Sequence, residues 1–317
     1  MSFKTVVVNS DRMNYDKALD MSVLSPDEVV EYLSTEPDQF AERLQGADCV
    51  VTKEIPITRD IIMSFPDSVK LLCEAGTGFN NVDLDACKER GITVCNIPIY
   101  SMKRMAHTTI MMILSLASTM RVQMAMLARG DKSNFKDRVQ VPLIEVNGKT
   151  LGVVGEGHIG AEVVKIAEAL DMNILVNTIE DRPDREHVKY VDLETLLRNS
   201  DFVTLHTPLM PATRHIMNEE TIGMMKPTAF LVNCSRGGLV DEKALIKALK
   251  EHKIAGAGLD VQEVEPPADD NPLYEMENVI LTPHMGWRGI ETRQRMVDMV
   301  ADNIKAYIAG KPTNVIV

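Results

Sequence analysis

The sequence predicts an α/β protein with parallel sheets, and three observations support this prediction. Short apolar runs rich in β-branched residues alternate with helical patterns along the whole chain, which is the pattern of βαβ units. A glycine-rich turn joins one such run to a helical pattern near the middle of the chain. The chain has 317 residues, more than one ordinary core accommodates, so its length favours two domains.

Ten segments are expected to form strands: residues 5–8, 49–52, 69–73, 92–95, 150–154, 174–178, 202–205, 229–233, 254–259 and 279–282. Helices are expected at residues 161–170, 242–251 and 289–310. The methionine-rich residues 101–129 are long enough for one further helix, which we expect to pack in the core or at a dimer interface. Because the strand series restarts at Thr150, we place the crossing between the domains near Tyr100.

The composition excludes several classes of partner. The formal net charge is −12, so nucleic acid and anionic membranes would repel the chain, and neither is expected as a partner. The five cysteines form no zinc-like CxxC pairs, and no metal site is expected. No signal-peptide pattern is present and no apolar stretch reaches the roughly 18 residues of a membrane span. We therefore expect a cytoplasmic protein with reduced, largely buried thiols.

The turn after residues 150–154 has the spacing of a dinucleotide-binding loop. Gly155, Gly157 and Gly160 form a GxGxxG pattern between the expected strand and helix. The first glycine permits a tight turn, the second lets the backbone approach a pyrophosphate, and the third allows close packing of helix on strand. The amides that follow, at His158 and Ile159, would then hold the anion. The alternative is an ordinary glycine-rich turn, and Glu156 is unusual because its carboxylate would repel a pyrophosphate unless the side chain points away.

The residues after the next strand bear on the choice between NAD and NADP. In NAD-binding versions of this loop an acidic residue about 20 positions further along binds the adenosine ribose. Thr178 stands where that acid is expected, and Glu180 is the alternative if the strand end is shifted. Arg182 or Arg185 would suit the 2′-phosphate of NADP, although Glu180 and Asp181 oppose that phosphate. NAD is the expected cofactor, and NADP is not excluded.

Four further segments carry a resemblance to a known family: residues 75–83 (AGTGFNNVD), 233–241 (NCSRGGLVD), 259–266 (LDVQEVEP) and 282–286 (TPHMG). Together with the glycine-rich loop they make the chain similar to the D-isomer-specific 2-hydroxyacid dehydrogenases over about residues 70 to 290. The resemblance implies two Rossmann-like domains with parallel sheets. Residues 1–100 and 285–317 would form a discontinuous substrate domain completed by the C-terminal helix, and residues 101–284 the dinucleotide-binding domain.

The resemblance also implies a reaction: NAD(P)-dependent hydride transfer that interconverts a small 2-oxo acid and its D-2-hydroxy acid. Arg236 would bind the substrate carboxylate, His284 would carry the proton, and Glu265 would support His284, with Glu263 as a nearby competitor. The chemistry needs these residue types. Reduction of a ketone places negative charge on its oxygen, so a general acid with a pKa near neutrality is required. Arginine presents a fixed planar fork to a carboxylate.

Further contacts follow from the same resemblance. Substrate would also meet Thr77, Gly78 and Tyr100. The cofactor would contact the glycine-rich loop (Gly155, Gly157, His158, Ile159, Gly160), together with Thr178, Thr207, Pro208, Thr213, Cys234, Ser235, Arg236, Asp260, His284 and Gly286.

Three interpretations of the function remain open at this point. An enzyme is expected, because Arg236, Glu265 and His284 are all present. An NAD(H)-sensing binding protein of the same fold is the alternative, and a phosphoglycerate dehydrogenase with a regulatory domain is disfavoured because the chain ends soon after the last helix. The substrate is expected to be short and unphosphorylated, with hydroxypyruvate favoured by the resemblance of Trp287 to one branch of the family. The family also implies a homodimer.

Overall fold

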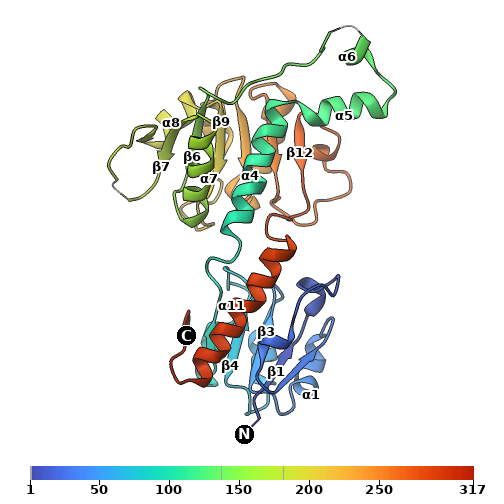
Figure 1. Ribbon diagram of the computed structural model, residues 1–317, viewed down its shortest axis with the longest axis vertical. Helices are drawn as coiled ribbons and strands as arrows, with labels where there is room; N and C mark the ends of the chain where they lie inside the picture. Colours follow the sequence, from blue (N-terminus) through green and yellow to red (C-terminus); the bar gives the residue numbers. More distant parts are fainter. Residues whose placement is uncertain (1, 137, 181) are drawn as a thin grey trace. The chain divides into compact units, whose positions relative to one another are not determined.

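The computed structural model describes residues 2–136, 138–180 and 182–317. These residues form two compact units (Figure 1). Unit 1 comprises Met1–Ser101 and Arg288–Val317, and unit 2 comprises Met102–Trp287. Each unit contains its own parallel sheet. The expectation of an α/β protein with two parallel sheets is confirmed.

Unit 1 is built on a five-stranded sheet with the order β2-β1-β3-β4-β5. Its strands are β1 (Lys4–Val7), β2 (Glu28–Glu31), β3 (Cys49–Thr52), β4 (Leu71–Glu74) and β5 (Thr93–Cys95), and all neighbouring pairs are parallel. In chain order this is the 2-1-3-4-5 arrangement of doubly wound α/β sheets. The inner strands β3 and β4 are short and fully buried because both faces of such a sheet are covered.

Four α-helices accompany this sheet: α1 (Phe40–Arg43), α2 (Arg59–Met63), α3 (Leu84–Glu89) and α11 (Ile290–Ile308). Asp83 caps α3, since its side chain accepts the N–H of Ala86 at 2.9 Å. The C-terminal helix α11 packs against β4. Its buried Arg293 donates to the carbonyl of Met13 at 3.0 Å and pairs with Asp16. Residues at the two ends of the chain therefore belong to one unit.

Unit 2 is built on a seven-stranded parallel sheet with the order β12-β11-β10-β9-β6-β7-β8. Its strands are β6 (Thr150–Val154), β7 (Asn173–Asn177), β8 (Val188–Tyr190), β9 (Phe202–Leu205), β10 (Phe230–Asn233), β11 (Gly256–Leu259) and β12 (Val279–Leu281). The chain order reverses between β6 and β9. In open parallel sheets, ligands bind at the carboxyl ends of the strands at such a reversal.

Helices cover both faces of the larger sheet. One apolar core joins the sheet to α4 (Met102–Ala117) and α7 (His158–Ala169). A second core joins the opposite face to α8 (Leu193–Asn199), α9 (Glu219–Gly223) and α10 (Glu242–Lys250). The short 3₁₀ helices of the chain are η1 (Ser10–Arg12), η2 (Ser22–Leu24), η3 (Pro37–Gln39), η4 (Gly237–Leu239) and η5 (Pro272–Tyr274). Unit 2 is thus a three-layer α/β structure.

The prediction of a single helix over residues 101–129 is wrong. The segment forms α4 and α5 (Met120–Ala128), which are bent by 63° relative to each other. The break lies at Thr119, whose φ of 44° ends the α4 geometry. Figure 1 shows α5 and the short α6 (Ser133–Lys136) extending away from the sheet of unit 2. In the described residues no single helix is long and apolar enough to cross a membrane; only the bent α4 and α5 pass that test together, and much of α4 is buried in the core.

Two strands were missed from the sequence, and both lie at a sheet edge. β2 has the sequence EVVE, and β8 has the sequence VKY. Edge strands carry charged residues that blunt aggregation, so their apolar pattern is weak. The ten predicted strands are confirmed to within two residues at each end.

Candidate active site

The glycine-rich loop lies between β6 and α7, at the reversal of strand order. Gly155 has a φ of 93°, and a Cβ there would stand 2.8 Å from the backbone N of Thr207. A Cβ on Gly160 would stand 2.2 Å from the carbonyl O of Gly155. Both positions therefore require glycine, one for its backbone conformation and one for close packing. Thr207 and Pro208, which follow β9, are brought beside the loop by this contact.

The loop fits an anionic dinucleotide. The N–H groups of Gly157, His158 and Ile159 have no acceptor among the described residues, and Gly157, the N-cap of α7, provides no side-chain cap. A Cβ on Gly157 would meet nothing within 4 Å, so the space beside it is open. Free amides at a helix N-terminus favour a phosphate group. The ring of His158 is exposed, so its amide rather than its ring belongs to this cradle.

Glu156, inside the loop, is turned into the connection between β7 and β8. Its side chain is only 3% exposed. Its carboxylate accepts from Arg182 Nη1 at 2.7 Å, Arg185 Nη2 at 2.8 Å and the hydroxyl of Tyr190 at 2.7 Å. The two arginines balance the charge of Glu156, so this carboxylate would repel a bound pyrophosphate much less.

Thr178 and Glu180 follow β7. Thr178 is half-buried and Glu180 is exposed. Glu180 accepts from Arg182 Nε at 2.8 Å, so it is a partner of an arginine in this structure. Asp181 lies outside the described residues.

His284 is held by its backbone and by a carboxylate. Its Nδ1 lies 2.8 Å from Glu265 Oε2. Its backbone has a φ of 48°, and its N–H donates to the carbonyl of Asp260 at 2.9 Å and to that of Thr282 at 3.0 Å. The side chain is 25% exposed. A left-handed backbone is uncommon for a residue with a side chain, and these hydrogen bonds hold it in place.

Asp260, at the end of β11, fastens the loop that carries His284. It is fully buried. Its Oδ1 accepts from Thr282 Oγ1 at 2.5 Å and from the N–H of Met285 at 2.9 Å, and its Oδ2 accepts from the N–H of Gly286 at 2.8 Å. Both oxygens are thus engaged by protein donors. These bonds hold the backbone of the loop that carries His284, and the contact of Asp260 with the cofactor stays a prediction.

Glu265, and not Glu263, is the partner of His284. Burial acts to raise the pKa of Glu265, but the hydrogen bond and charge of His284, the Gln262 amide and the charge of Arg236 outweigh it and hold the pKa below its usual value. Glu265 is therefore ionised at neutral pH. Glu263 binds His215 at 2.8 Å and Arg214 at 3.0 Å instead.

Arg236 follows β10 and its side chain is exposed. Asn233 donates to the carbonyl of Arg236 at 2.9 Å. A Cβ on Gly237 would lie 1.8 Å from the carbonyl O of Gln262, so the Arg236 turn packs backbone to backbone against the segment that leads to Glu265. The influence of Arg236 on the pKa of Glu265 agrees with this proximity.

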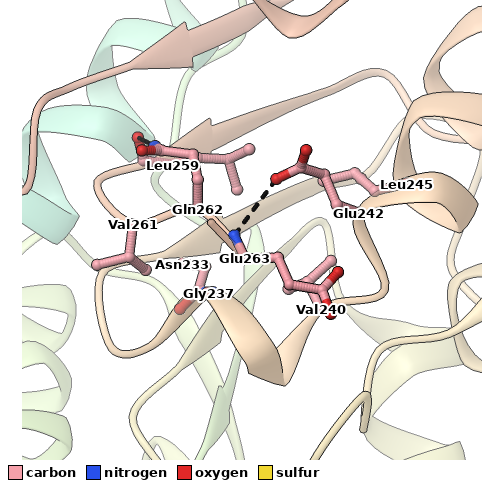
Figure 2. Close-up of a pocket in the computed structure, with 9 residues that line it drawn as sticks. All are labelled: Asn233, Gly237, Val240, Glu242, Leu245, Leu259, Val261, Gln262 and Glu263. Atoms are coloured by element: carbon pink, nitrogen blue, oxygen red, sulfur yellow. Dashed lines mark hydrogen bonds between the residues drawn. The ribbon is translucent and has the colours of Figure 1, made fainter. Parts of the chain in front are cut away.

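A small pocket is lined by residues of β10, β11, α10 and the segments that follow the two strands (Figure 2). It has room for about one water molecule, too little for a 2-oxo acid. On one side the N–H of Glu263 donates to Glu242 Oε2 at 3.3 Å. The lining residues are Asn233, Gly237, Val240, Glu242, Leu245, Leu259, Val261, Gln262 and Glu263. The pocket belongs to the support of the turn and not to a substrate site.

Three predicted cofactor contacts have side chains already engaged by the protein. The thiol of Cys234 is buried against Met112, and burial raises its pKa to about 12. Ser235 donates to the carbonyl of Leu205 at 2.9 Å. Thr213 donates to the carbonyl of Pro208 at 2.7 Å. These residues could therefore contact a cofactor only through their backbone groups, or by accepting a hydrogen bond at the hydroxyl oxygen of Ser235 or Thr213.

In unit 1, the turn after β4 presents free amides. Thr77 donates from its hydroxyl to Ile97 O at 3.1 Å, and Ile97 N–H donates to Gly76 O at 3.1 Å, which fixes the turn. The N–H groups of Thr77 and Gly78 have no acceptor among the described residues. They suit a carboxylate. Tyr100, by contrast, is only 4% exposed.

A buried ammonium lies beneath this turn and was missed from the sequence. The side chain of Lys53 is fully buried and its Nζ lies 2.5 Å from Glu54 Oε1. A Cβ on Gly76 would stand 3.0 Å from Glu74 Oε1 and 3.4 Å from Lys53 Nζ. The only sequence signal is a lysine directly after the four buried residues of β3, and a charged residue there usually faces water.

These features define a class of protein. A dinucleotide cradle at the switch point of a parallel sheet serves a hydride carrier, and a histidine bound to an ionised carboxylate serves proton transfer. Both are requirements of a nicotinamide-dependent dehydrogenase.

Comparison with known proteins identifies the family. Residues 110–286 match the model of the D-isomer specific 2-hydroxyacid dehydrogenase, NAD binding domain. The chain is 39% identical over 296 residues to the glycerate dehydrogenase of Methylorubrum extorquens, covering 92% of each chain. It is 36% identical over 286 residues to the hydroxypyruvate reductase of Blautia hydrogenotrophica, covering 89% of this chain and 88% of the relative. The NAD-complexed D-isomer specific 2-hydroxyacid dehydrogenase of Lactobacillus delbrueckii ssp. bulgaricus superposes with a TM-score of 0.84 at 26% identity, covering 99% of this chain and 100% of that one.

The chain belongs to the D-isomer specific 2-hydroxyacid dehydrogenase family. It is an NAD-dependent oxidoreductase that acts on the CH–OH group of 2-hydroxy acids, and the predictions of the family, the reaction and NAD as cofactor are confirmed. The alternative of an NAD(H)-sensing binding protein is not favoured, because these relatives are enzymes.

Proposed function

We propose that the chain reduces a short, unphosphorylated 2-oxo acid to its D-2-hydroxy acid, with Arg236, Glu265 and His284 as its catalytic set. The observation that carries this proposal is the bond between His284 Nδ1 and Glu265 Oε2. An ionised carboxylate only accepts, so Nδ1 donates and Nε2 remains for the substrate oxygen. The nicotinamide ring, when bound, supplies the hydride. His284 Nε2 gives its proton to the carbonyl oxygen as negative charge develops there.

Arg236 has the complementary role. Its exposed guanidinium suits the substrate carboxylate, which fixes the carbonyl relative to His284. In unit 1, the free amides of Thr77 and Gly78 are the proposed second set of donors for the carboxylate.

Hydroxypyruvate is the substrate we favour within this class. Two of the relatives are named glycerate dehydrogenase and hydroxypyruvate reductase, which supports this choice. A phosphate at the far end of the substrate would need a further basic group. Lys103 and Arg104, at the start of α4, are the candidates for that purpose; Arg104 donates to Thr108 on its own helix at 2.7 Å, and Lys103 is exposed.

A substrate panel tests the proposal. Hydroxypyruvate, glyoxylate, pyruvate, a branched-chain 2-oxo acid and 3-phosphohydroxypyruvate are each assayed with NADH, and the product is resolved by chiral chromatography. We expect the highest kcat/KM for hydroxypyruvate or glyoxylate and a D product. A kcat/KM for 3-phosphohydroxypyruvate about tenfold above that for hydroxypyruvate, or an L product, contradicts the proposal; tenfold corresponds to about 1.4 kcal/mol of transition-state binding.

We further propose that the chain forms a homodimer through the segment that contains α5 and α6. This segment exposes large apolar side chains, among them Met124 at 63%, Phe135 at 79% and Leu143 at 57%. Such side chains in one segment are typical of an interface. Light scattering after gel filtration is expected to give a dimer for the wild type and a monomer for Phe135→Glu. The matched control is Leu33→Glu, at a residue that is 64% exposed in unit 1 and is expected to change nothing.

A cytoplasmic location is proposed as well. All five cysteines are free and buried, which agrees with the expected reduced thiols and with a reducing compartment. Fractionation of the native host tests this location, and recovery of the protein outside the cytoplasmic fraction contradicts it.

A further inference from the structure

We infer that Glu156 determines the preference for NAD over NADP by holding Arg182 and Arg185 in ion pairs that keep both guanidinium groups from a 2′-phosphate. The inference rests on the proposed use of the glycine-rich loop for NADH. Glu156 would act on specificity and not on the chemical step, since its carboxylate faces the β7–β8 connection and no reacting group.

Arg182 and Arg185 lie where a protein could bind the 2′-phosphate of NADP. Both lie in the connection that follows β7, where the residue that binds the adenosine ribose is found in dinucleotide folds. Thr178 stands in place of the acid that normally repels a 2′-phosphate. Two nearby arginines and no opposing acid at Thr178 would by themselves favour NADP. Discrimination in favour of NAD therefore depends on the acids that face these arginines, and Glu180, the described acid of the connection, is 63% exposed.

The hydrogen bonds show which acids bind the arginines. Arg182 donates Nη1 to Glu156 Oε2 at 2.7 Å and Nε to Glu180 at 2.8 Å, and its Nη2 also contacts Glu180. All three of its nitrogens are thus engaged. Arg185 donates Nη2 to Glu156 Oε1 at 2.8 Å. The two guanidinium charges are balanced by the two carboxylates.

Of the two carboxylates, Glu156 binds the arginines more strongly because it is buried. Its side chain is 3% exposed, whereas that of Glu180 is 63% exposed. A buried carboxylate that loses its cationic partners keeps an uncompensated charge out of water, which is strongly unfavourable. The arginines can turn to a 2′-phosphate only at that cost. Among the described residues Glu180 bonds only to Arg182, and it remains solvated, so it binds the arginines more weakly than Glu156 does.

Removal of the charge at Glu156 tests the inference. Glu156→Gln keeps the size of the side chain and leaves both arginines without their buried counter-ion. Calorimetry measures the Kd of the full-length protein for NADH, NADPH, 5′-AMP and 2′,5′-ADP. We expect Kd for NADPH and 2′,5′-ADP to fall about tenfold or more, the size of one charge-assisted hydrogen bond, while Kd for NADH and 5′-AMP changes less than about threefold.

Two sets of control variants separate this effect from general changes. Glu194→Gln removes the same charge from an exposed pair with Arg198 on α8 and is expected to change none of the four constants. In the triple variant Glu156→Gln/Arg182→Gln/Arg185→Gln the gain in NADPH affinity is expected to disappear. In the wild-type background, Arg182→Gln/Arg185→Gln leaves the buried Glu156 carboxylate without its cationic partners, so Kd for NADH and Kd for NADPH are expected to rise together and their ratio to change less than about threefold.

Three results overturn the inference. One is an unchanged ratio of NADH to NADPH affinity in a folded Glu156→Gln variant. Another is a gain in NADPH affinity that persists in the triple variant. The third, informative even if Glu156→Gln fails to fold, is a loss of NADPH affinity alone in Arg182→Gln/Arg185→Gln, which would show that the arginines bind the phosphate in the wild type. By contrast, wild-type protein that binds neither NADH nor 5′-AMP contradicts the proposed function itself.

Discussion

The imidazole of His284 and the carboxylate of Glu265 are joined by a hydrogen bond of 2.8 Å between Nδ1 and Oε2. The other carboxylate oxygen, Oε1, accepts the N–H of Gln262 at 3.1 Å. Both oxygens of Glu265 thus face donors. This geometry fixes the orientation of the ring, with Nδ1 donating to Glu265 and Nε2 left for the substrate oxygen.

Replacement of Glu265 by glutamine should impair proton transfer without unfolding the protein. The amide of a glutamine must turn its own N–H toward either His284 or Gln262, so one of the two hydrogen bonds is lost together with the negative charge. We expect kcat to fall by about ten- to a thousand-fold, with Kd for NADH unchanged. Stopped-flow reduction of hydroxypyruvate and a separate NADH titration measure the two quantities.

Glu263→Gln is the matched control for this variant. Glu263 lies two positions away and binds His215 and Arg214 instead of His284. Its replacement is expected to lower kcat by less than about threefold, since it alters local support only. Equal losses in the two variants would remove the special role assigned to Glu265.

His284→Ala is expected to lower turnover by about a hundred- to ten thousand-fold, the usual contribution of a general acid. NADH affinity should change little, because the main-chain contacts of residue 284 with Asp260 and Thr282 do not need the ring. Turnover is measured under conditions where chemistry limits the rate. A variant that keeps more than about a tenth of wild-type turnover shows that another group carries the proton.

Much of the fold followed from the sequence because buried parallel strands give an unmistakable apolar pattern. The four residues of β3, for example, are all buried and apolar or small. β2 and β8 escaped notice because edge strands need no continuous apolar run. The break between α4 and α5 escaped as well, since Thr119 carries no glycine or proline signal for its left-handed backbone.

The sequence indicates candidate site residues where the reaction needs one particular residue type, such as a histidine for proton transfer. The pairing of His284 with Glu265 is an example, whereas the catalytic roles of His284, Glu265 and Arg236 stay predictions. The partners of Glu156 could not be predicted, because Arg182, Arg185 and Tyr190 reach it across 26 to 34 positions of sequence. Burial of Lys53 was equally hidden, since only the packed structure shows that the residue has no access to water.

Arg236→Lys is expected to raise KM for the 2-oxo acid and to lower kcat together, reducing kcat/KM by about a hundredfold or more. A single ammonium cannot reproduce the two parallel hydrogen bonds of a guanidinium to a carboxylate, so both binding and orientation suffer. NADH affinity, measured by titration, should stay within about threefold. Arg214→Lys, at an exposed arginine that binds Glu263, is the control and should leave kcat/KM nearly unchanged. If Arg236→Lys keeps the wild-type kcat/KM, the substrate carboxylate is bound by a group other than Arg236.

His206, at the end of β9 beside the glycine-rich loop, should make stability depend on pH. Burial lowers the pKa of His206 from 6.5 to about 4 in the folded protein, and its ring bonds to the hydroxyl of Thr204. Between these two pH values the unfolded chain binds a proton at this residue and the folded protein does not. The contribution of the neutral ring to the free energy of unfolding is therefore fully present above pH 6.5 and is lost as the pH falls toward 4.

A comparison with His206→Asn isolates this effect from other titrating groups, because contributions from distant residues cancel in the difference. Across the window from 6.5 down to 4, the wild type should lose up to about 3 kcal/mol of unfolding free energy relative to the variant. Urea denaturation at several pH values within the window measures both proteins. His252→Asn, at an exposed histidine that follows α10, should show no such difference from the wild type at any of these pH values. Parallel pH profiles for wild type and His206→Asn would show that the ring is protonated as readily in the folded protein as in the unfolded chain.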